Sequence, residues 1–472
     1  MKPVAIVGAG ITGLTAAFYL QQRGIPVVVY EASSRTGGMI QTTSHGGFLA
    51  ELGPNTIMTN SVAVPRLMKD LGLESRRVLP SATATTRYIV RNGRLVRVPQ
   101  SLPGAIGTAL LSLSAKLRVL GEPFIPKSSQ LDESLAAFVR RRLGGEFLDY
   151  LIDPFVAGVY AGDPEQLSVI HALPRMAALE QHYGSLMKGA VRGAKERRDR
   201  NAPLASEPRM FSLDGGLRVL TDTLASWLNN AIRLCCPVRG IERCPEGWYV
   251  DSPAGREYHS AVLFCSPAHR FPHLAAGQEL AEELKNFEQV YYPPIARLAF
   301  GFRRSQVEHP LDGFGALVPR KERLSILGVL FSSSMFANRA PRSHVLLTAF
   351  AGGARNPDLA HQHPDQIASL ALDDLRRLLG ITGLPAFQDV VKVDRSIPQY
   401  NVGYGVVKQL IQRIEARSPG LYFAGNFSHG ISVSDCIAAG AATAERIAVA
   451  SREQSSPAVP ELVSAALSRG IS

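Results

Sequence analysis

The sequence is poor in cysteine and in aromatic residues. It has five cysteines in 472 residues; Cys235 and Cys236 are adjacent, and no Cys-x-x-Cys pair occurs. This pattern excludes a disulfide framework and a structural zinc site, so we expect no metal and reduced, buried cysteines in a cytosolic protein. Aromatic residues make up 7% of the chain, whereas glycine occurs 42 times. Such a balance favours tightly packed α/β structure over an all-β sandwich.

A long hydrophobic run is also missing. The longest uncharged stretch, residues 98–115, contains prolines, glycines and serines, which makes it a poor membrane-spanning helix but an acceptable interfacial one. Glycines interrupt the first apolar stretch, so we expect neither a signal peptide nor a transit peptide. The net charge of +11 favours anionic partners. The basic run at 188–200 has no interleaved aromatic residues, and we therefore expect no nucleic-acid partner.

A glycine-rich motif, VAIVGAGITGL, stands close to the N-terminus. Gly8, Gly10 and Gly13 follow a short apolar strand and open a helix, and a second apolar strand ends at Glu31. The first glycine permits a tight turn, the second lets the backbone approach a diphosphate, and the third lets the helix pack closely on the strand. The acidic residue can bond the hydroxyl groups of a ribose. The motif therefore predicts a dinucleotide-binding βαβ unit.

The residues after the second strand indicate which dinucleotide is bound. The stretch EASSRTGGM continues from Glu31 into Arg35 and the paired glycines Gly37 and Gly38. It resembles the FAD signature of amine-oxidase-like and glutathione-reductase-like flavoproteins, in which the arginine and the glycines lie on the diphosphate side. An NAD-dependent dehydrogenase does not need this extension. The resemblance therefore implies FAD.

A second strand–loop–helix unit, LYFAGNFSHGISVSDCIAAG, lies near the other end of the chain. We expect a strand over 421–423, a turn at Gly425 and Asn426, and a helix entered through 431–433. In the same superfamily such a unit holds the flavin end of FAD, which the first βαβ unit does not hold. The positive end of the helix suits the electron-rich flavin or its diphosphate. We expect Asp435 to compensate the helix dipole.

Taken together, the motifs resemble the protoporphyrinogen oxidase family, the FAD enzymes of late haem and chlorophyll synthesis. The matching stretches follow the family's order from residue 4 to about 447: GAGITGLTAAFYL, EASSRTGGMI, ELGPNTI, RYIVRNGRLVRVP, FGALVP, LGVLFSSSMFANRAP, IPQYNVGY and GNFSHGISVSDCIAAG. The LGVLFSSSMFANRAP stretch looks more like the plastid-type branch. Without a transit peptide, we expect a bacterial copy.

Together with the distribution of strand-like and helix-like stretches along the chain, the resemblance predicts an α/β fold in three parts. These are a Rossmann-like FAD-binding domain, a mixed-sheet substrate domain and a helical membrane-binding insert. We expect the FAD-binding domain at 1–86, 209–280 and 394–450, the substrate domain at 87–98 and 281–393, the insert at 99–208, and a flexible tail at 451–472. The insert combines the uncharged segment 101–115 with basic clusters at 140–142 and 195–200, as in a monotopic anchor.

The resemblance also implies site residues. Asn55 matches a residue suggested to orient or deprotonate the substrate, and is the candidate catalytic residue. Arg87 matches an arginine that pairs with a propionate group of the porphyrinogen. The apolar wall around the macrocycle would be Phe314, Gly315, Leu317, Leu327 and Phe350. The FAD contacts would be Gly8, Ala9, Gly10, Ile11, Thr12, Gly13, Glu31, Ala32, Arg35, Gly37, Gly38, Met39, Gly53, Pro54, Asn55, Thr56, Val238, Gly425, Asn426, Ile431, Ser432 and Val433.

The implied reaction is the oxidation of protoporphyrinogen IX to protoporphyrin IX. Six hydrogens leave in three flavin cycles, O₂ reoxidises the flavin and H₂O₂ is released. No strong base is required, because the protons of the macrocycle can leave to solvent, and the flavin performs the difficult step. The resemblance further implies a peripheral position on the inner face of the cell membrane, hand-over of product to ferrochelatase, and a homodimer.

Three alternatives remain open at this stage. The first is oxidation of coproporphyrinogen III by the same fold; its four propionates call for more than one basic residue in the pocket, and Arg87 is one candidate. The second is a flavin amine oxidase, although the loop Phe427-Ser428-His429 makes an aromatic amine cage doubtful. The third is a non-catalytic membrane or haem-trafficking protein that keeps FAD for stability.

Overall fold

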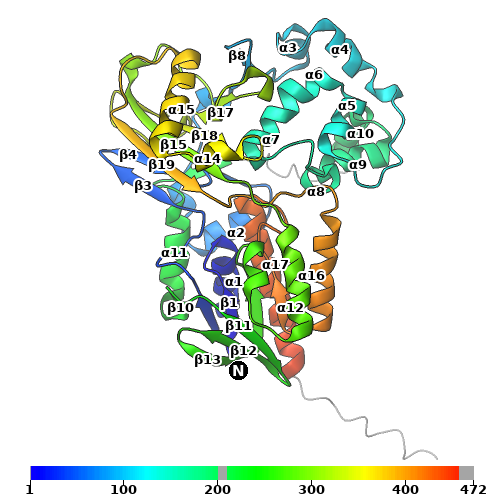
Figure 1. Ribbon diagram of the computed structural model, residues 1–472, viewed down its shortest axis with the longest axis vertical. Coiled ribbons are helices and arrows are strands. Elements are labelled where there is room, and N and C mark those ends of the chain that lie inside the picture. The colour runs from blue at the N-terminus through cyan, green and yellow to red at the C-terminus, as the bar shows by residue number, and fades with distance from the viewer. Residues whose placement is uncertain (1, 200–209, 456–472) are drawn as a thin grey trace, which may run out of the picture.

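The computed structural model describes residues 2–199 and 210–455. Figure 1 shows three parts: a lower α/β domain, an upper domain built on a second sheet with α15, and a helical region beside it that contains α3–α10. The α/β fold and the mixed second sheet agree with the prediction. The predicted tail begins too early, because α17 (Val433–Ser455) continues past residue 451; the rest of the tail, 456–472, lies outside the described residues.

The lower domain is built on a parallel sheet of five strands in the order β10-β2-β1-β14-β20. This is the doubly wound arrangement that the first glycine motif predicts. The strands come from both ends and the middle of the chain, so distant segments form one domain. They are β1 (Val4–Val7), β2 (Val27–Tyr30), β10 (Ile232–Arg233), β14 (Ala261–Phe264) and β20 (Leu421–Phe423).

Helices cover one face of this sheet and a mixed layer covers the other. The helical face holds α1 (Ile11–Gln21), α11 (Arg218–Leu228) and α17, while the opposite face packs against the meander β11 (Gly240–Cys244), β12 (Gly247–Ser252) and β13 (Gly255–His259). The four leucines that recur on one side of α11 are all buried, as their spacing predicts: Leu217, Leu220, Leu224 and Leu228.

The second sheet has seven strands in the order β19-β15-β18-β17-β16-β7-β8. All neighbours are antiparallel except β16 and β7. Helix α15 (Pro364–Leu379) covers one face, and the other face looks toward the lower α/β domain and the helical insert. The strands are β7 (Arg87–Arg91), β8 (Arg94–Arg97), β15 (Ile295–Arg303), β16 (Gly315–Leu317), β17 (Ile326–Leu330), β18 (His344–Gly352) and β19 (Phe387–Val393).

The insert is helical, as predicted. One of its two predicted basic clusters, however, does not face outward: Arg142 is fully buried, and Arg141 bonds Glu133 and Glu180. Only Arg140 of that cluster is half exposed. The second cluster, 195–200, lies where side chains are outside the described residues. The helices are α3 (Leu102–Gly107), α4 (Leu113–Leu120), α5 (Leu135–Arg142), α6 (Gly145–Phe147), α7 (Asp153–Tyr160), α8 (Val169–Ala172), α9 (Pro174–Tyr183) and α10 (Leu186–Asp199).

Shorter elements join the three parts. They are β3 (Thr42–His45), β4 (Phe48–Glu51), β5 (Ile57–Met58), β6 (Arg77–Val78), β9 (Met210–Leu213), α2 (Ala63–Asp70), α12 (Gln278–Lys285), α13 (Ser332–Met335), α14 (Pro357–His361) and α16 (Gly405–Arg417). Within residues 2–199 and 210–455, no helix combines the length and apolarity needed to span a bilayer. All five cysteines are free, but Cys235 is exposed, so the expectation of uniformly buried cysteines is wrong.

Candidate functional site: an FAD cleft and a substrate wall

The first glycine loop has the geometry that its sequence predicts. Gly8 has a positive φ of 110°, and a Cβ there would lie 3.1 Å from the Ser266 backbone nitrogen. A Cβ on Gly13 would lie 2.0 Å from the Gly8 carbonyl oxygen, so only glycine allows α1 to pack this closely on the loop. A Cβ on Gly10, in contrast, meets no protein atom within 4 Å. The loop is therefore closed toward the protein and open at Gly10, where a diphosphate would approach.

Glu31 and Arg35 lie beside this loop at the carboxyl edge of the parallel sheet. The Glu31 carboxylate accepts hydrogen bonds from the Ala9 N–H (2.8 Å) and from the Ser33 N–H (2.8 Å). Arg35 is exposed, and its guanidinium donates to the Gly38 carbonyl (2.9 Å). The Gly37 N–H donates to the Ala9 carbonyl (2.8 Å), which joins the paired glycines to the first loop.

The late strand–loop–helix unit meets the first one across the domain. A Cβ on Gly440 of α17 would lie 2.5 Å from the Thr12 carbonyl oxygen of α1, so the two helices touch backbone to backbone. At the start of α17, Ser432 Oγ accepts from the Asp435 N–H (3.1 Å) and donates to its carboxylate (2.6 Å). Asp435 is therefore a capping residue, which confirms its expected interaction with the helix terminus.

The remaining predicted cofactor residues line the edge between these units. The loop 53–56 is partly exposed, and Met39, beside it, is 42% exposed. A Cβ on Gly53 would lie 1.9 Å from the Met39 carbonyl oxygen, so the loop is pressed against the segment that follows the paired glycines. Val238 is partly buried and follows β10. Gly8, Glu31 and Gly425 closely follow strands of the one parallel sheet, and so share its carboxyl edge.

The residues present fit a flavin dinucleotide. The open space at Gly10 and the N-terminus of α1 suit a diphosphate, because the first backbone N–H groups of a helix have no partner within it. Glu31 suits a ribose, and the N-terminus of α17 suits the electron-rich end of a flavin. When bound, the flavin supplies two-electron redox chemistry.

Three of the predicted substrate residues, Arg87, Leu317 and Phe350, share one face of the seven-stranded sheet. Leu317 pairs with Gly328, and Gly328 pairs with Phe350 on the next strand. Arg87 lies on β7 two residues before Ile89, the partner of Leu317, and period-two alternation places it on the same face. Its guanidinium lies 5.5 Å from the centre of the Phe314 ring. The sheet therefore presents an apolar wall with a cation at one end.

Helix α7 borders this wall. A Cβ on Gly158 would lie 2.4 Å from a methyl carbon of Leu317, so the helix crosses the wall at a glycine. Leu327 is 4% exposed, and its side chain packs toward Gly353 rather than opening fully to the wall. Leu317 and Phe350 remain partly exposed, and Gly315 is buried.

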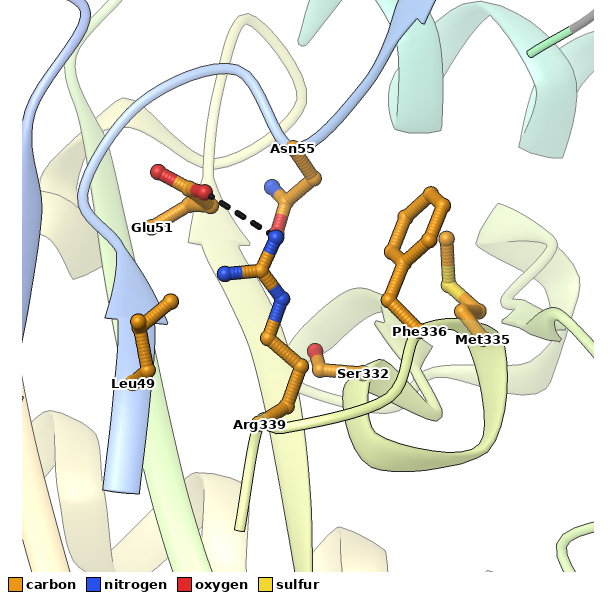
Figure 2. Close-up of a pocket in the computed structure, with 7 residues that line it drawn as sticks. All are labelled: Leu49, Glu51, Asn55, Ser332, Met335, Phe336 and Arg339. Atoms are coloured by element: carbon orange, nitrogen blue, oxygen red, sulfur yellow. Dashed lines mark ion pairs between the residues drawn. The ribbon is translucent and has the colours of Figure 1, made fainter. Parts of the chain in front are cut away.

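A small pocket adjoins the wall beneath Asn55. Figure 2 shows Asn55, Glu51 and Arg339 converging on it from two segments of the chain, with Met335 and Phe336 on the opposite side. Asn55 donates its amide to the Gly53 carbonyl (3.2 Å). Met335 and Phe336 also pack against Phe314. Because the Arg87 guanidinium lies over the Phe314 ring, this contact links the pocket to the Arg87 end of the wall.

Sequence reasoning did not predict the charged pair in this pocket. Glu51 and Arg339 are 4% exposed each; their charged groups lie 3.5 Å apart, and Arg339 donates to Ser212 Oγ (2.5 Å). Burial raises the pKa of Glu51, although the Thr42 hydroxyl, Arg339 and the Leu217 N–H oppose that rise. Both residues lie inside stretches that resemble the family, ELGPNTI and MFANRAP, so the signal was present in the sequence.

Comparison with known proteins agrees with this geometry. The sequence pattern described as "Flavin containing amine oxidoreductase" matches residues 11–448. Protoporphyrinogen oxidase 2 of Arabidopsis thaliana is 34% identical, over 94% of this chain and 94% of its own length. Coproporphyrinogen III oxidase of Bacillus subtilis is 28% identical, over 93% of this chain and 97% of its own length.

Among solved structures, a protein of Exiguobacterium sp. 255-15, provisionally assigned as a protoporphyrinogen oxidase, superposes with a TM-score of 0.80. It is 27% identical, and the match covers 95% of this chain and 99% of that one. The family match extends over most of the chain, from the start of α1 through the late strand–loop–helix unit, and with the named relatives it confirms the predicted cofactor, FAD. The chain is a flavin-dependent oxidoreductase of the flavin containing amine oxidoreductase family, in the group with the protoporphyrinogen and coproporphyrinogen III oxidases.

Proposed function

We propose that this protein oxidises protoporphyrinogen IX to protoporphyrin IX. The flavin accepts two electrons and the accompanying hydrogen in each cycle, three cycles remove six hydrogens, and O₂ takes the electrons to give H₂O₂. The proposal is supported by the names of the relatives and by a wall that suits a large apolar ring with carboxylates at one edge.

The observation that carries the proposal is the position of Arg87. It is the exposed cation at the end of an otherwise apolar wall, and its guanidinium lies against the Phe314 ring at 5.5 Å. A guanidinium binds a carboxylate through two parallel hydrogen bonds, which fixes both the position and the rotation of the bound molecule. Leu317 and Phe350 would then hold the macrocycle flat, while Asn55 orients it from the pocket side.

An amine oxidase is less well supported by the structure. The loop that would supply an aromatic cage contains Phe427, which is fully buried. Its ring lies 5.3 Å from that of Phe271 and packs into the core under the late unit. It therefore has no face free to hold an amine before the flavin.

Anaerobic reduction of the bound flavin separates the three candidate functions. The absorption spectrum of the purified holoprotein is recorded before and after addition of protoporphyrinogen IX, and again with simple amines. Bleaching by the porphyrinogen, followed by H₂O₂ release on admission of O₂, supports the proposal. Bleaching only by amines supports an amine oxidase. A flavin that is reduced neither by the porphyrinogen nor by the amines supports a non-catalytic protein.

Arg87→Met is expected to raise KM for protoporphyrinogen IX by about 10- to 100-fold, because a hydrogen bond to a charged group contributes about 1.5–3 kcal/mol. The apolar wall and the flavin site are untouched by the change, so kcat is expected to fall much less. Steady-state kinetics measure both constants. Arg94→Met, an exposed arginine on the neighbouring strand, is the matched control and should not alter KM. An unchanged KM in Arg87→Met would refute the assigned role.

We further propose that the insert rests on a membrane surface. Three leucines of α4 stand exposed on one face, Leu113, Leu117 and Leu120, and Phe124 follows with 87% exposure. Exposed cations flank this apolar surface at Lys127, Lys188 and Arg192. Apolar side chains with basic neighbours are the pattern of an interfacial helix on an anionic bilayer.

Leu117→Glu together with Leu120→Glu is expected to abolish co-sedimentation with vesicles that contain phosphatidylglycerol. The two carboxylates would lie in the apolar layer, which disfavours binding strongly. The double variant Leu370→Glu and Val402→Glu, also exposed but outside the insert, is the control and should sediment like the wild type. Equal sedimentation of both variants would rule out this surface. A position inside the cell, hand-over to ferrochelatase and a homodimer stay predictions.

A further inference from the structure

A buried tyrosine bonds the late loop, residues 425–430, at two places. Tyr400 is 4% exposed, and its hydroxyl donates to the Asn426 carbonyl (2.5 Å) and accepts from the Gly430 N–H (3.0 Å). One hydroxyl thus bridges two backbone groups that are four residues apart in the loop. Burial raises the pKa of Tyr400, so the hydroxyl keeps its proton in neutral solution and remains a donor.

A second tyrosine bonds the same loop between these two places. The Tyr404 hydroxyl donates to the Phe427 carbonyl (2.7 Å), and the Tyr404 ring lies 4.5 Å from that of Tyr400. Because a trans peptide group is planar, the direction of the Asn426 carbonyl also fixes that of the Phe427 N–H on the opposite side of the group. The two tyrosines therefore set the orientation of the backbone dipoles in the late loop.

The late loop joins the parallel sheet to the helix that faces the cofactor. It follows β20 at the carboxyl edge of the sheet and leads into α17. Gly425, Asn426 and residues 431–433 are among those that the family resemblance assigns to FAD. Hydrogen bonds and charges around a flavin tune its electronics. A residue that fixes this loop can therefore act on the flavin without touching it.

Tyr400 is itself held by the helical insert. The Ser168 N–H donates to the Tyr400 carbonyl (2.8 Å), and the Val402 N–H donates to the Gln166 carbonyl (2.9 Å). The backbone around Tyr400 is thus bonded to residues outside the FAD-binding domain. The position of the tyrosine does not depend on the loop alone, so its hydroxyl can hold the loop in one place.

We propose that Tyr400 is a positioning residue for the flavin, which acts through the late loop on the reduction potential of the bound FAD and on the rate of substrate oxidation. The part that concerns the rate rests on the proposed function, whereas the part that concerns the potential rests on FAD binding alone. Reduced flavin is richer in electrons than oxidised flavin, so correctly directed backbone N–H groups stabilise it more. Loss of the hydroxyl bridge is therefore expected to lower the potential.

Tyr400→Phe tests this role because it removes the hydroxyl and keeps the ring. The midpoint potential of the flavin is measured in the purified holoprotein by anaerobic titration against a reference dye. The preference of the protein for reduced over oxidised flavin is expected to fall about 3- to 10-fold, in line with the loss of a hydrogen bond. For a two-electron couple, this change lowers the potential by about 14–30 mV.

Tyr19→Phe is the matched control. Tyr19 is 2% exposed, and its hydroxyl donates to the Asp70 carboxylate (3.1 Å) near the end of α1 that lies away from the glycine loop. Each variant loses one buried hydroxyl, but only Tyr400→Phe should alter the potential. An unchanged potential in Tyr400→Phe, or equal shifts in the two variants, overturns the inference. If Tyr400→Phe retains no FAD, Tyr404→Phe takes its place and should also lower the potential.

The rate of anaerobic flavin reduction by protoporphyrinogen IX tests the second part. At saturating substrate it is expected to fall about 3- to 10-fold in Tyr400→Phe. The substrate concentration that gives half of this rate should change little, because Arg87 and the apolar wall are untouched. A change in that concentration alone would assign Tyr400 to substrate binding and contradict the inference. A wild type that oxidises no porphyrinogen refutes the proposed function, and the measurement of the potential then still decides the role of Tyr400.

Discussion

Gly13→Ala is expected to give a purified protein with a markedly lower content of FAD. The added Cβ would lie 2.0 Å from the Gly8 carbonyl oxygen and 3.2 Å from a side-chain carbon of Ile6. The first obstacle is backbone, which cannot swing aside, so α1 must move away from β1 and carry the loop with it. Overpacking of this kind costs about 1–3 kcal/mol, enough to lower FAD affinity by about tenfold or more. Absorbance of the purified protein in the flavin bands measures the loss.

Gly10→Ala separates this packing effect from a direct clash with the cofactor. No protein atom lies within 4 Å of the added Cβ, so the apoprotein should melt at the wild-type temperature. The methyl group instead occupies the space through which the diphosphate approaches, and FAD affinity should fall. If Gly10→Ala binds FAD normally, the diphosphate does not lie against this loop, and the assignment of the site from the glycine spacing is wrong.

The first βαβ unit could be predicted because its physical constraints are local in sequence. Three glycines, two apolar strands and one acidic residue fall within about thirty positions, and each has a single plausible structural role. The late unit at 421–433 was predicted equally closely, with its strand at Leu421–Phe423. The apolar face of α11 followed from the spacing of its leucines.

The charged groups could not be placed in this way. Arg297 stands in an apolar strand, and its partner Asp389 comes from β19, which only the folded sheet places beside β15. Arg140, Arg141 and Arg142 form a run that resembles a solvated basic patch, because the sequence does not show which side of a helix its acidic partners approach. Contacts between residues far apart in the chain decide burial, and no local pattern encodes them.

Arg142→Met is therefore expected to destabilise the insert by about 3–5 kcal/mol, the usual effect of breaking a buried ion pair. Arg142 is fully buried, lies 3.1 Å from the Glu122 carboxylate, and donates through Nε to that of Glu180 (2.6 Å). Without the guanidinium, Glu180 keeps Arg141 as a partner, whereas Glu122 keeps only the Ser185 hydroxyl and backbone N–H groups. Limited proteolysis of the insert measures its local unfolding.

Arg140→Ala is the matched control for that variant. Arg140 pairs with Glu165 at the surface and is half exposed, so its loss should change stability by about 0–1 kcal/mol. Similar proteolysis rates in the two variants would show that the buried network around Arg142 contributes no more to the stability of the insert than the surface pair of Arg140 and Glu165 does.

The pH dependence provides a further test of the same network. Burial by itself raises the pKa of Glu180, but hydrogen bonds from Arg141 and Arg142 outweigh it and hold the pKa below its usual range. In the wild type this stabilisation is present above the usual carboxyl range and is lost as the pH falls through the lowered pKa. In Arg142→Met one of these two hydrogen bonds is lost and the pKa of Glu180 rises, so the variant has less of this stabilisation to lose as the pH falls. The difference in proteolysis rate between variant and wild type should therefore narrow as the pH falls, and a difference that widens would contradict an electrostatic origin.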